Sequence, residues 1–135
     1  MTLAHLSSKI NIRIYYEDTD AGGVVYHSRY LNFAERARAE FLRNLSLKQT
    51  FISQKYKIQF VVKKLKVDYM SFCKLDDQIE LFTNLENISR VKLLFKHTFY
   101  KNNKVILNMN VTICCVSNSG KVARMPKSLY HEIIN

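Results

Sequence analysis

The sequence is organised around one segment that joins a predicted strand to a predicted helix: Tyr15-Tyr16-Glu17-Asp18-Thr19-Asp20-Ala21-Gly22-Gly23-Val24-Val25-Tyr26-His27. This segment gathers tyrosines, three carboxylates and a histidine around the only adjacent pair of glycines in a chain that has three glycines. Backbone N–H groups at the start of a helix lack intrahelical partners and carry partial positive charge. A site at this junction can therefore stabilise developing negative charge.

The residues on either side of this segment follow the periods of a strand and of a helix. From Asn11 to Glu17, apolar and polar residues alternate, which predicts a strand with Tyr16 on its apolar face. Ser28 is the predicted N-cap of a helix that extends to Leu45. Apolar residues cover more than half the girth of this helix, so we expect it to be buried; they are Tyr30, Leu31, Phe33, Ala34, Ala37, Phe41, Leu42 and Leu45.

Alternation in the second half of the chain predicts an antiparallel meander. Strands are expected at residues 79–88, 90–100 and 105–116, because apolar residues recur there at every second position. Residues 101–104 form a predicted hairpin turn, since asparagine tolerates the positive φ that such turns require. Short connections between consecutive strands favour antiparallel pairing. We therefore expect an α+β fold in which an antiparallel sheet curves around one helix.

The remaining segments complete this expected domain. The strand predicted from Ile58 to Tyr69 changes its apolar face near Val61-Val62, as at a β-bulge. Residues 48–57 are expected to form a loop with one short helical turn. Pro126 suits the first turn of a closing helix. At 135 residues the chain has the size of one domain, so we expect a single domain over residues 1–135.

The charge favours an anionic partner. The net charge of +10 arises from 21 Lys and Arg residues against 11 Asp and Glu residues. The basic residues are spread along the chain and no nucleic-acid signature accompanies them, so we expect no nucleic acid as partner. The hypothesis of a nucleic-acid-binding protein is an alternative that only the net charge supports. Simple solvation of surface charges explains the composition equally well.

Three further expectations concern the setting of the protein. The odd number of cysteines, of which Cys114 and Cys115 are neighbours, favours a reducing, cytoplasmic location. We expect no membrane insertion, because no run of about 18 apolar residues is present. A single curved sheet leaves strand edges uncovered, and strand pairing between subunits covers such edges, so we expect a homo-oligomer.

No metal site is expected in the central segment. In a calcium loop that begins at Asp18, the fifth and twelfth positions should be oxygen ligands, but they are Gly22 and Arg29. A transition-metal site built from Asp18, Asp20 and His27 has no second histidine or cysteine at ligand spacing. The sequence thus predicts neither a metal nor another cofactor.

Nucleophilic triads fit the sequence no better. Ser28 stands beside His27 but lacks a nucleophile elbow, and Cys73 has no histidine nearby in sequence. His97 alternates with apolar residues in a predicted strand. It is more simply a histidine of the core or of an interface.

Asp20 is the best candidate for chemistry. A carboxylate next to a glycine pair and a helix start can act on a carbonyl carbon whose oxygen is held by a backbone N–H, with Gly23 as the expected donor. Tyr16 and His27 flank this position and could orient the substrate, position water or hold the carboxylate. The alternative is that Asp18 and Asp20 only accept hydrogen bonds from turn amides, which we favour for Asp18.

These residues resemble a known family. The central segment, together with later motifs in the same order, is similar to the 4-hydroxybenzoyl-CoA thioesterase family and, within it, to the YbgC-like acyl-CoA thioesterases. The likeness covers nearly the whole chain. It implies the hotdog fold and a homodimer or homotetramer with active sites at subunit boundaries. The later motifs are Tyr30-Leu31, Glu35-Arg36-Ala37-Arg38, Phe60-Val61-Val62, Val67-Asp68-Tyr69, Leu75-Asp76-Asp77 and Arg124-Met125-Pro126.

The resemblance implies hydrolysis of acyl-CoA or acyl-carrier-protein thioesters. Asp20 matches the catalytic aspartate of the family and Gly23 its carbonyl-polarising amide. Whether the carboxylate attacks the carbonyl directly or activates water stays open. The supporting and substrate-binding positions in the same segment are Tyr16, Val24, Tyr26 and His27.

Coenzyme A would be part of the substrate and not a cofactor. Its phosphates, and the acidic surface of an acyl carrier protein, would suit the basic charge of the chain. Arg90, at a predicted turn, and Lys92 beside it are candidates for phosphate contacts, with plain solvated turn residues as the alternative. A second function stays open as well, which is a non-catalytic hotdog module that binds an acyl carrier or a partner protein.

Overall fold

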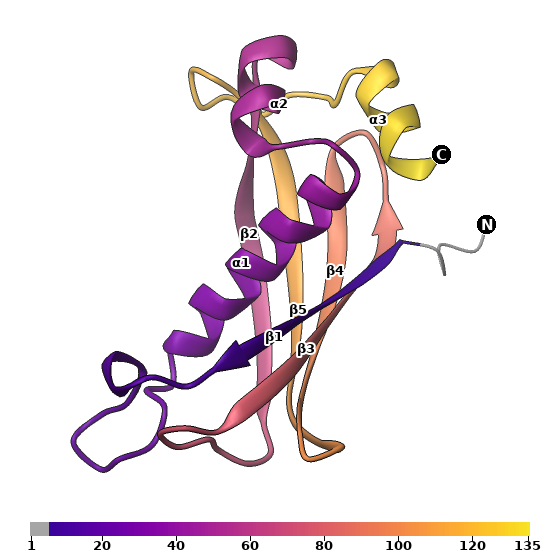
Figure 1. Cartoon of the computed structure of the whole chain (residues 1–135). Coiled ribbons are helices and arrows are strands. Elements are labelled where there is room, and N and C mark those ends of the chain that lie inside the picture. Colours follow the sequence, from indigo (N-terminus) through magenta and orange to yellow (C-terminus); the bar gives the residue numbers. More distant parts are fainter. Residues whose placement is uncertain (1–5) are drawn as a thin grey trace.

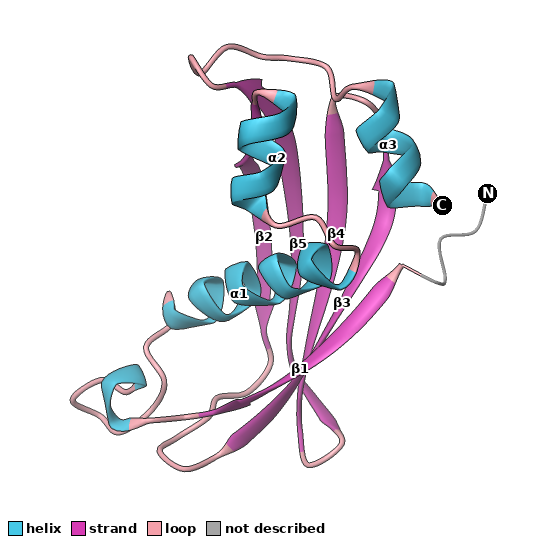
Figure 2. Ribbon diagram, turned by 45° about the horizontal axis from the view of Figure 1, so that its top comes forward, coloured by secondary structure: helices cyan, strands magenta, loops and turns pink. Residues whose placement is uncertain are grey.

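The computed structural model describes residues 6–135 and has a five-stranded antiparallel sheet with the order β1-β3-β4-β5-β2. Helix α1 lies across one face of this curved sheet (Figures 1 and 2). This is the α+β hotdog arrangement expected from the sequence. The elements are β1 (Ser7–Arg13), the 3-10 turn η1 (Tyr16–Asp18), α1 (Arg29–Asn44), α2 (Gln49–Tyr56), β2 (Ile58–Tyr69), β3 (Gln78–Ile88), β4 (Lys92–Lys101), β5 (Lys104–Ser117) and α3 (Lys127–Ile134).

Helix α1 is buried on the face that the apolar spacing predicts. The ring of Tyr30 packs edge-on against Phe33 and Phe99, with centroids 6.1 and 5.7 Å away. Ser28 stands at the N-cap position as expected, but its side chain makes no capping hydrogen bond because its backbone is already helical. The apolar side chains of α1 that lie in the core are Tyr30, Phe33, Ala34, Ala37, Phe41 and Leu42.

The meander of β3, β4 and β5 forms as the sequence predicts. Buried and less buried residues alternate along all three strands, because one face of the sheet packs on α1. The β4–β5 turn has Asn102 and Asn103 at φ values of 51° and 63°. In β2 the pairing register with β5 shifts between Val62 and Lys64, which confirms the predicted bulge.

The first strand differs from the prediction. It ends at Arg13, and the chain then turns into η1, where Tyr16 is 82% exposed instead of facing the core. The cause is local: the Asp18 carboxylate accepts a hydrogen bond from the backbone N–H of Tyr15 at 2.8 Å, and this bond closes a tight turn. The strand begins earlier than expected, at Ser7, where β1 pairs with β3.

Helix α2 is also longer than predicted. The segment expected to contain one short turn forms an eight-residue helix from Gln49 to Tyr56, which ends where Lys57 adopts a left-handed conformation with φ of 59°. Only Ile52 of this helix is buried. A helix that buries one side chain has almost no apolar periodicity, so its sequence does not reveal it.

One polar cluster lies inside the core, and we call Arg38, Thr83 and His97 the core cluster. Burial, and next the charge of Arg38, lower the pKa of His97 to about 3. The ring is therefore neutral: Nε2 accepts from Arg38 Nη1 at 3.0 Å, and Nδ1–H donates to Thr83 Oγ1 at 3.0 Å. This confirms the prediction that His97 belongs to the core or an interface.

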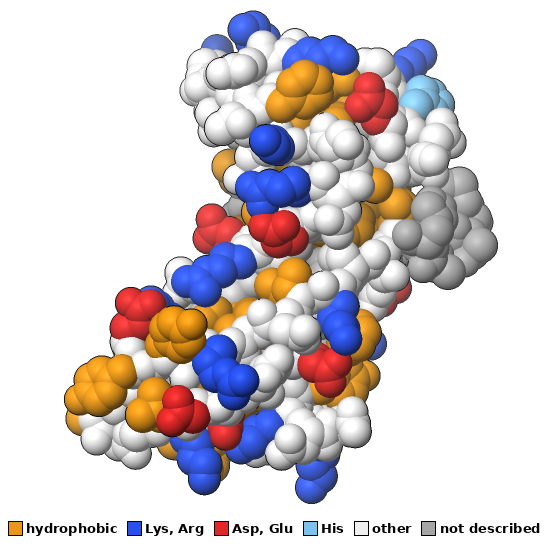
Figure 3. Space-filling view, viewed as in Figure 1, with side chains coloured by type: hydrophobic (Ala, Val, Ile, Leu, Met, Phe, Trp, Pro, Cys, Tyr) orange, Lys and Arg blue, Asp and Glu red, His pale blue; other side chains and the backbone are white. Residues whose placement is uncertain are grey.

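Both edges of the sheet, β1 and β2, lack a pairing partner on one side within residues 6–135. The β2 edge carries exposed apolar side chains: Val61, Val62 and Leu65 are 37%, 47% and 40% exposed. Lys and Arg side chains are scattered over the surface shown in Figure 3, with Asp and Glu among them. Across residues 6–135, no helix has the length and apolar character needed to cross a membrane.

Candidate active site

Two loops at one end of the sheet hold each other in place. The backbone N–H of Val25 donates to the carbonyl of Cys73 at 2.8 Å, and that of Ile14 donates to the carbonyl of Asp77 at 2.8 Å. The Tyr30 hydroxyl on α1 accepts from the Cys73 N–H at 3.2 Å. The segment from residue 15 to residue 27, which we call the Asp20 loop, is thereby fixed to both the sheet and the helix.

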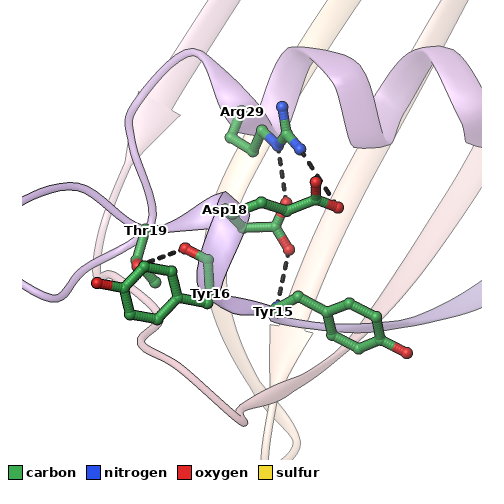
Figure 4. Close-up of polar contacts among 6 residues, drawn as sticks. Tyr15, Tyr16, Asp18, Thr19 and Arg29 are labelled. Carbon is green, nitrogen blue, oxygen red and sulfur yellow. Dashed lines mark hydrogen bonds and ion pairs between the residues drawn. The ribbon is translucent and has the colours of Figure 1, made fainter.

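Asp18 has a structural role in this loop (Figure 4). Its side chain is buried, and one carboxylate oxygen accepts from the Tyr15 N–H. The other oxygen accepts from Arg29 Nε at 2.7 Å, while Glu17 lies 3.9 Å from the same guanidinium. Asp18 thus ties the turn to the first residue of α1, which agrees with its predicted role as a turn acceptor.

Asp20 is exposed, and its two carboxylate oxygens differ. Oδ1 accepts hydrogen bonds from the backbone N–H groups of Gly22 at 2.8 Å and Val24 at 3.4 Å. Oδ2 has no hydrogen-bond partner within residues 6–135. One oxygen therefore orients the carboxylate, and the other is available to a ligand.

The glycine pair makes this geometry possible. A Cβ at Gly22 would lie 3.2 Å from Asp20 Oδ1, so a side chain there would crowd the carboxylate. Gly23 has φ of +84°, a conformation that side chains rarely adopt. The Gly23 N–H, which is the predicted polarising donor, is engaged by the Asp20 carbonyl at 3.0 Å.

The start of α1 offers other donors. The backbone N–H groups of His27 and Ser28 have no hydrogen-bond partner in the described part of the chain. The carbonyl of His27 accepts from the Tyr69 hydroxyl at 2.7 Å, which holds the helix start against the end of β2. The His27 ring stands 4.5 Å from that of Tyr26, and both residues are exposed.

A cavity of about 420 Å³ opens beside Asp20. It brings together three of the predicted site residues, Tyr16, Asp20 and Gly23, with Leu75 from the neighbouring loop. Val24, Tyr26 and His27 follow in the same loop but do not line this cavity. Sequence reasoning missed Tyr69, whose only signal was its place in a motif at the end of a strand.

The predicted phosphate-binding residues lie elsewhere. Strand β3 begins beside the Asp20 loop and ends next to Arg90, so Arg90 and Asp20 are at opposite ends of the sheet within one chain. The length of β3 separates these ends by about 35 Å. Arg90 Nε donates to the carbonyl of Met125 at 2.8 Å, and Lys92 is exposed at the start of β4.

The residues around this loop favour neither metal binding nor a cysteine nucleophile. Among the described residues, no group of three His, Cys, Asp or Glu side chains is arranged to hold a metal ion. Burial raises the pKa of the Cys73 thiol to about 11, and it raises that of Cys115 to about 11 as well. Neither thiol is therefore an activated nucleophile.

The fold, with an exposed carboxylate in the loop that leads into its buried helix, is compatible with a thioesterase-like class of protein, and comparison with known proteins identifies that class. The family model described as "Thioesterase-like superfamily" matches residues 15–133. The chain is 43% identical over 119 residues to an acyl-CoA thioesterase YbgC from Haemophilus influenzae, covering 87% of this chain and 88% of that protein. It is 38% identical over 123 residues to the acyl-CoA thioester hydrolase YbgC from an Escherichia coli strain, covering 90% and 91%.

A solved structure gives the same picture. A probable thioesterase from Bartonella henselae superimposes with a TM-score of 0.84 at 27% identity, covering 89% of this chain and 99% of that one. The chain therefore belongs to the thioesterase-like superfamily and, within it, to the YbgC-like branch. This confirms the family expected from the sequence motifs.

Proposed function

We propose that this chain is an acyl-CoA thioester hydrolase in which Asp20 acts on the thioester carbonyl. The observation that carries the proposal is the free Oδ2 of Asp20, held at the edge of a cavity in the loop that leads into α1. The high identity to relatives named as acyl-CoA thioesterases supports it. The fold alone would not, because one fold supports many functions.

Two chemical routes use the same carboxylate. In the first, Asp20 Oδ2 attacks the carbonyl carbon, the bond to sulfur breaks to release the CoA thiolate, and water then cleaves the mixed anhydride. In the second, Oδ2 takes a proton from a water molecule that attacks the carbon, and the bond to sulfur then breaks to release CoA and the free acid. Both need one fixed and one free oxygen on the carboxylate, which is the arrangement that Asp20 has.

The oxyanion formed in either route needs hydrogen-bond donors. The unpaired N–H groups of His27 and Ser28, at the positive end of α1, are the proposed donors. Gly23 would contribute through its backbone conformation, because its own N–H is engaged by the Asp20 carbonyl. This shifts the polarising role predicted for Gly23 toward the helix start.

The other residues predicted for the site would bind the substrate. Tyr16 lines the cavity and is 82% exposed, so its hydroxyl could orient water or the thioester. The paired rings of Tyr26 and His27, with Val24 before them, would form the wall along which the substrate approaches. All of these residues are in the Asp20 loop.

We propose a homodimer in which two β2 strands pair across a twofold axis. The exposed Val61, Val62 and Leu65 side chains lie on this free edge and would be covered. The paired strands would be antiparallel. The Arg90 end of one subunit would then lie at the same end of the dimer as Asp20 of the other. Two such dimers would give the homotetramer.

This pairing gives Arg90 and Lys92 a role. Across the dimer they would reach the phosphates of a CoA molecule whose thioester lies at Asp20 of the partner, although they are remote from Asp20 in their own chain. The net charge of +10 would increase the encounter rate with CoA or with an acidic acyl carrier protein. The three free cysteines support a cytoplasmic location.

The test is hydrolysis of a panel of acyl-CoA thioesters of increasing chain length. We expect turnover that survives prolonged treatment with EDTA, and a dimer mass by light scattering at micromolar concentration. Tight binding of acyl-CoA without release of CoA would instead identify a non-catalytic acyl-binding module. Loss of activity that a divalent ion restores would require a metal site.

A further inference from the structure

A second cavity, of about 290 Å³, opens between α1, the start of α2 and the first residues of β2. Its polar lining consists of Glu35, Arg38 and Gln49. The remaining walls are apolar, so a ligand in this cavity would be mostly hydrocarbon. The apolar lining includes Leu42, Phe60, Val61, Leu93, Phe95 and Ile113.

Arg38 is a buried cation without an anionic partner among residues 6–135. It is 8% exposed, and its only hydrogen bond goes to Nε2 of the neutral His97. Glu35, one helical turn earlier, is exposed and forms no ion pair with it. Burial lowers the pKa of Arg38, which the Glu35 charge opposes in part. A buried charge in this state lacks full electrostatic compensation.

Arg38 has hydrogen-bond donors that the protein does not use, and it lines the cavity. A guanidinium has five N–H donors, and the contact with His97 uses one of them. Ser8 Oγ is the one side-chain polar atom in the described chain that is both fully buried and unpaired. The unbonded nitrogens of Arg38 are not in this state, so they are accessible to a small molecule. The cavity that Arg38 lines is the route by which a ligand would reach them.

We propose that this cavity binds the far end of an acyl group that terminates in a carboxylate, with Arg38 donating to the carboxylate oxygens. The proposal rests on the thioesterase function proposed above. Arg38 lies about 13 Å along α1 from the helix start, so a hydrocarbon chain must separate the thioester from the carboxylate. Val61 and Val62 place one wall of this cavity on the free β2 edge, which the proposed dimer would cover.

The first test compares matched substrates. The mono-CoA thioesters of hexanedioic, octanedioic and decanedioic acid are assayed against hexanoyl-, octanoyl- and decanoyl-CoA. At the length that fits, kcat/KM for the diacid thioester should exceed that of its plain counterpart about tenfold or more, the scale of a charge-assisted hydrogen bond. A preference for the plain acyl group at every length overturns the proposal.

Substitution tests the role of Arg38. Arg38→Met should lower kcat/KM for the preferred diacid thioester at least tenfold more than for its plain counterpart. Arg38→Lys should recover part of the preference, since it keeps the charge but not the fork of donors. The matched control is Arg36→Met, an exposed arginine of the same helix outside this cavity. If Arg38 is only structural, its variants lower the melting temperature and leave the substrate ratio at the wild-type value.

Binding can be tested without hydrolysis. The wild-type protein is titrated with hexanedioate, octanedioate and decanedioate in turn, and the Arg38 Nε–H and His97 ring signals are followed by NMR. At the length that fits, the diacid should give a saturable shift that the monocarboxylate of the same length does not give. A shift in a protein that hydrolyses no thioester would support this site and defeat the proposed function. Hydrolysis of plain acyl-CoA, with no NMR shift from any of the three diacids, would support the proposed function and overturn this site.

Discussion

The Asp20 loop and the core cluster both collect polar side chains, but they differ in their access to solvent. In the core cluster, burial fixes the protonation state of His97 and aligns its two ring nitrogens with Arg38 and Thr83. In the loop, Asp20 is exposed and keeps one oxygen free. The difference indicates that substitution of Asp20 should change turnover, whereas substitution of His97 in the core cluster should change stability.

The largest effect on turnover, with little effect on stability, is expected for Asp20→Asn. The amide oxygen can still accept from the Gly22 and Val24 N–H groups, so the loop should keep its shape. An amide is neither a carboxylate nucleophile nor a general base. Turnover of acyl-CoA should therefore fall by about 10²-fold or more, while the melting temperature stays near that of the wild type. A folded variant with wild-type turnover would show that this carboxylate is structural.

The core cluster should show the opposite behaviour in a pH titration. The folded pKa of His97 is about 3, below its usual value near 6.5, so only the unfolded chain takes up a proton on this residue as pH falls through 6.5. This histidine should therefore remove about 2 kcal/mol of stability between pH 6.5 and pH 5.

His97→Gln is the matched control for this slope. Its amide can accept from Arg38 and donate to Thr83, but it does not titrate. Denaturant unfolding at several pH values measures the difference. Equal slopes for the variant and the wild type would mean that the ring is not held neutral in the folded protein.

A smaller effect on stability is expected for Asp18→Asn. The substitution weakens the contact with Arg29 and keeps an acceptor for the Tyr15 N–H. Loss of the charge should destabilise the protein by about 1.5 kcal/mol, the scale of a charged hydrogen bond. Turnover below the melting transition should fall far less than in Asp20→Asn. A greater loss of turnover than in that variant would exchange the roles of the two aspartates.

The smallest effect is expected at the remote end of the sheet. Arg90→Glu should raise KM for acyl-CoA about fivefold at low ionic strength and change kcat less, because a phosphate contact acts on binding. Lys55→Glu, at an exposed position of α2, makes the same change of charge and is the control for a non-specific effect of net charge. Equal KM values for the two variants would remove Arg90 from the substrate site.

The sequence predicts those elements whose side chains alternate between core and solvent. In β4, for example, Leu93, Phe95, His97 and Phe99 are buried and their neighbours are more exposed, so the period of the strand is visible. The central helix is visible for the same reason. Helix α2 is not, because Ile52 is its only buried residue. The spacing of apolar residues reflects which side chains are buried, so it does not reveal an element that buries few side chains.

The candidate site was predictable in identity but not in geometry. Asp20 stands out because of its spacing to the glycines, yet no sequence rule shows that the Gly23 N–H is engaged by a carbonyl. Tyr16 was misplaced because the side chain of Asp18 closes a turn that ends the strand. Arg38 reads as a surface residue in a helix, and only the tertiary contact with His97 reveals its burial.

The strand order β1-β3-β4-β5-β2 has a consequence for how the chain folds during synthesis. The central strands are joined by tight turns and can pair as soon as they emerge, because short loops close at low entropic cost. The edge strands must wait, since Arg13 pairs with Gln78 and Ile58 with Ser117. Helix α1 leaves the ribosome before any of the meander, with its apolar face uncovered. The nascent chain therefore carries an exposed apolar helix until the last strand has been made.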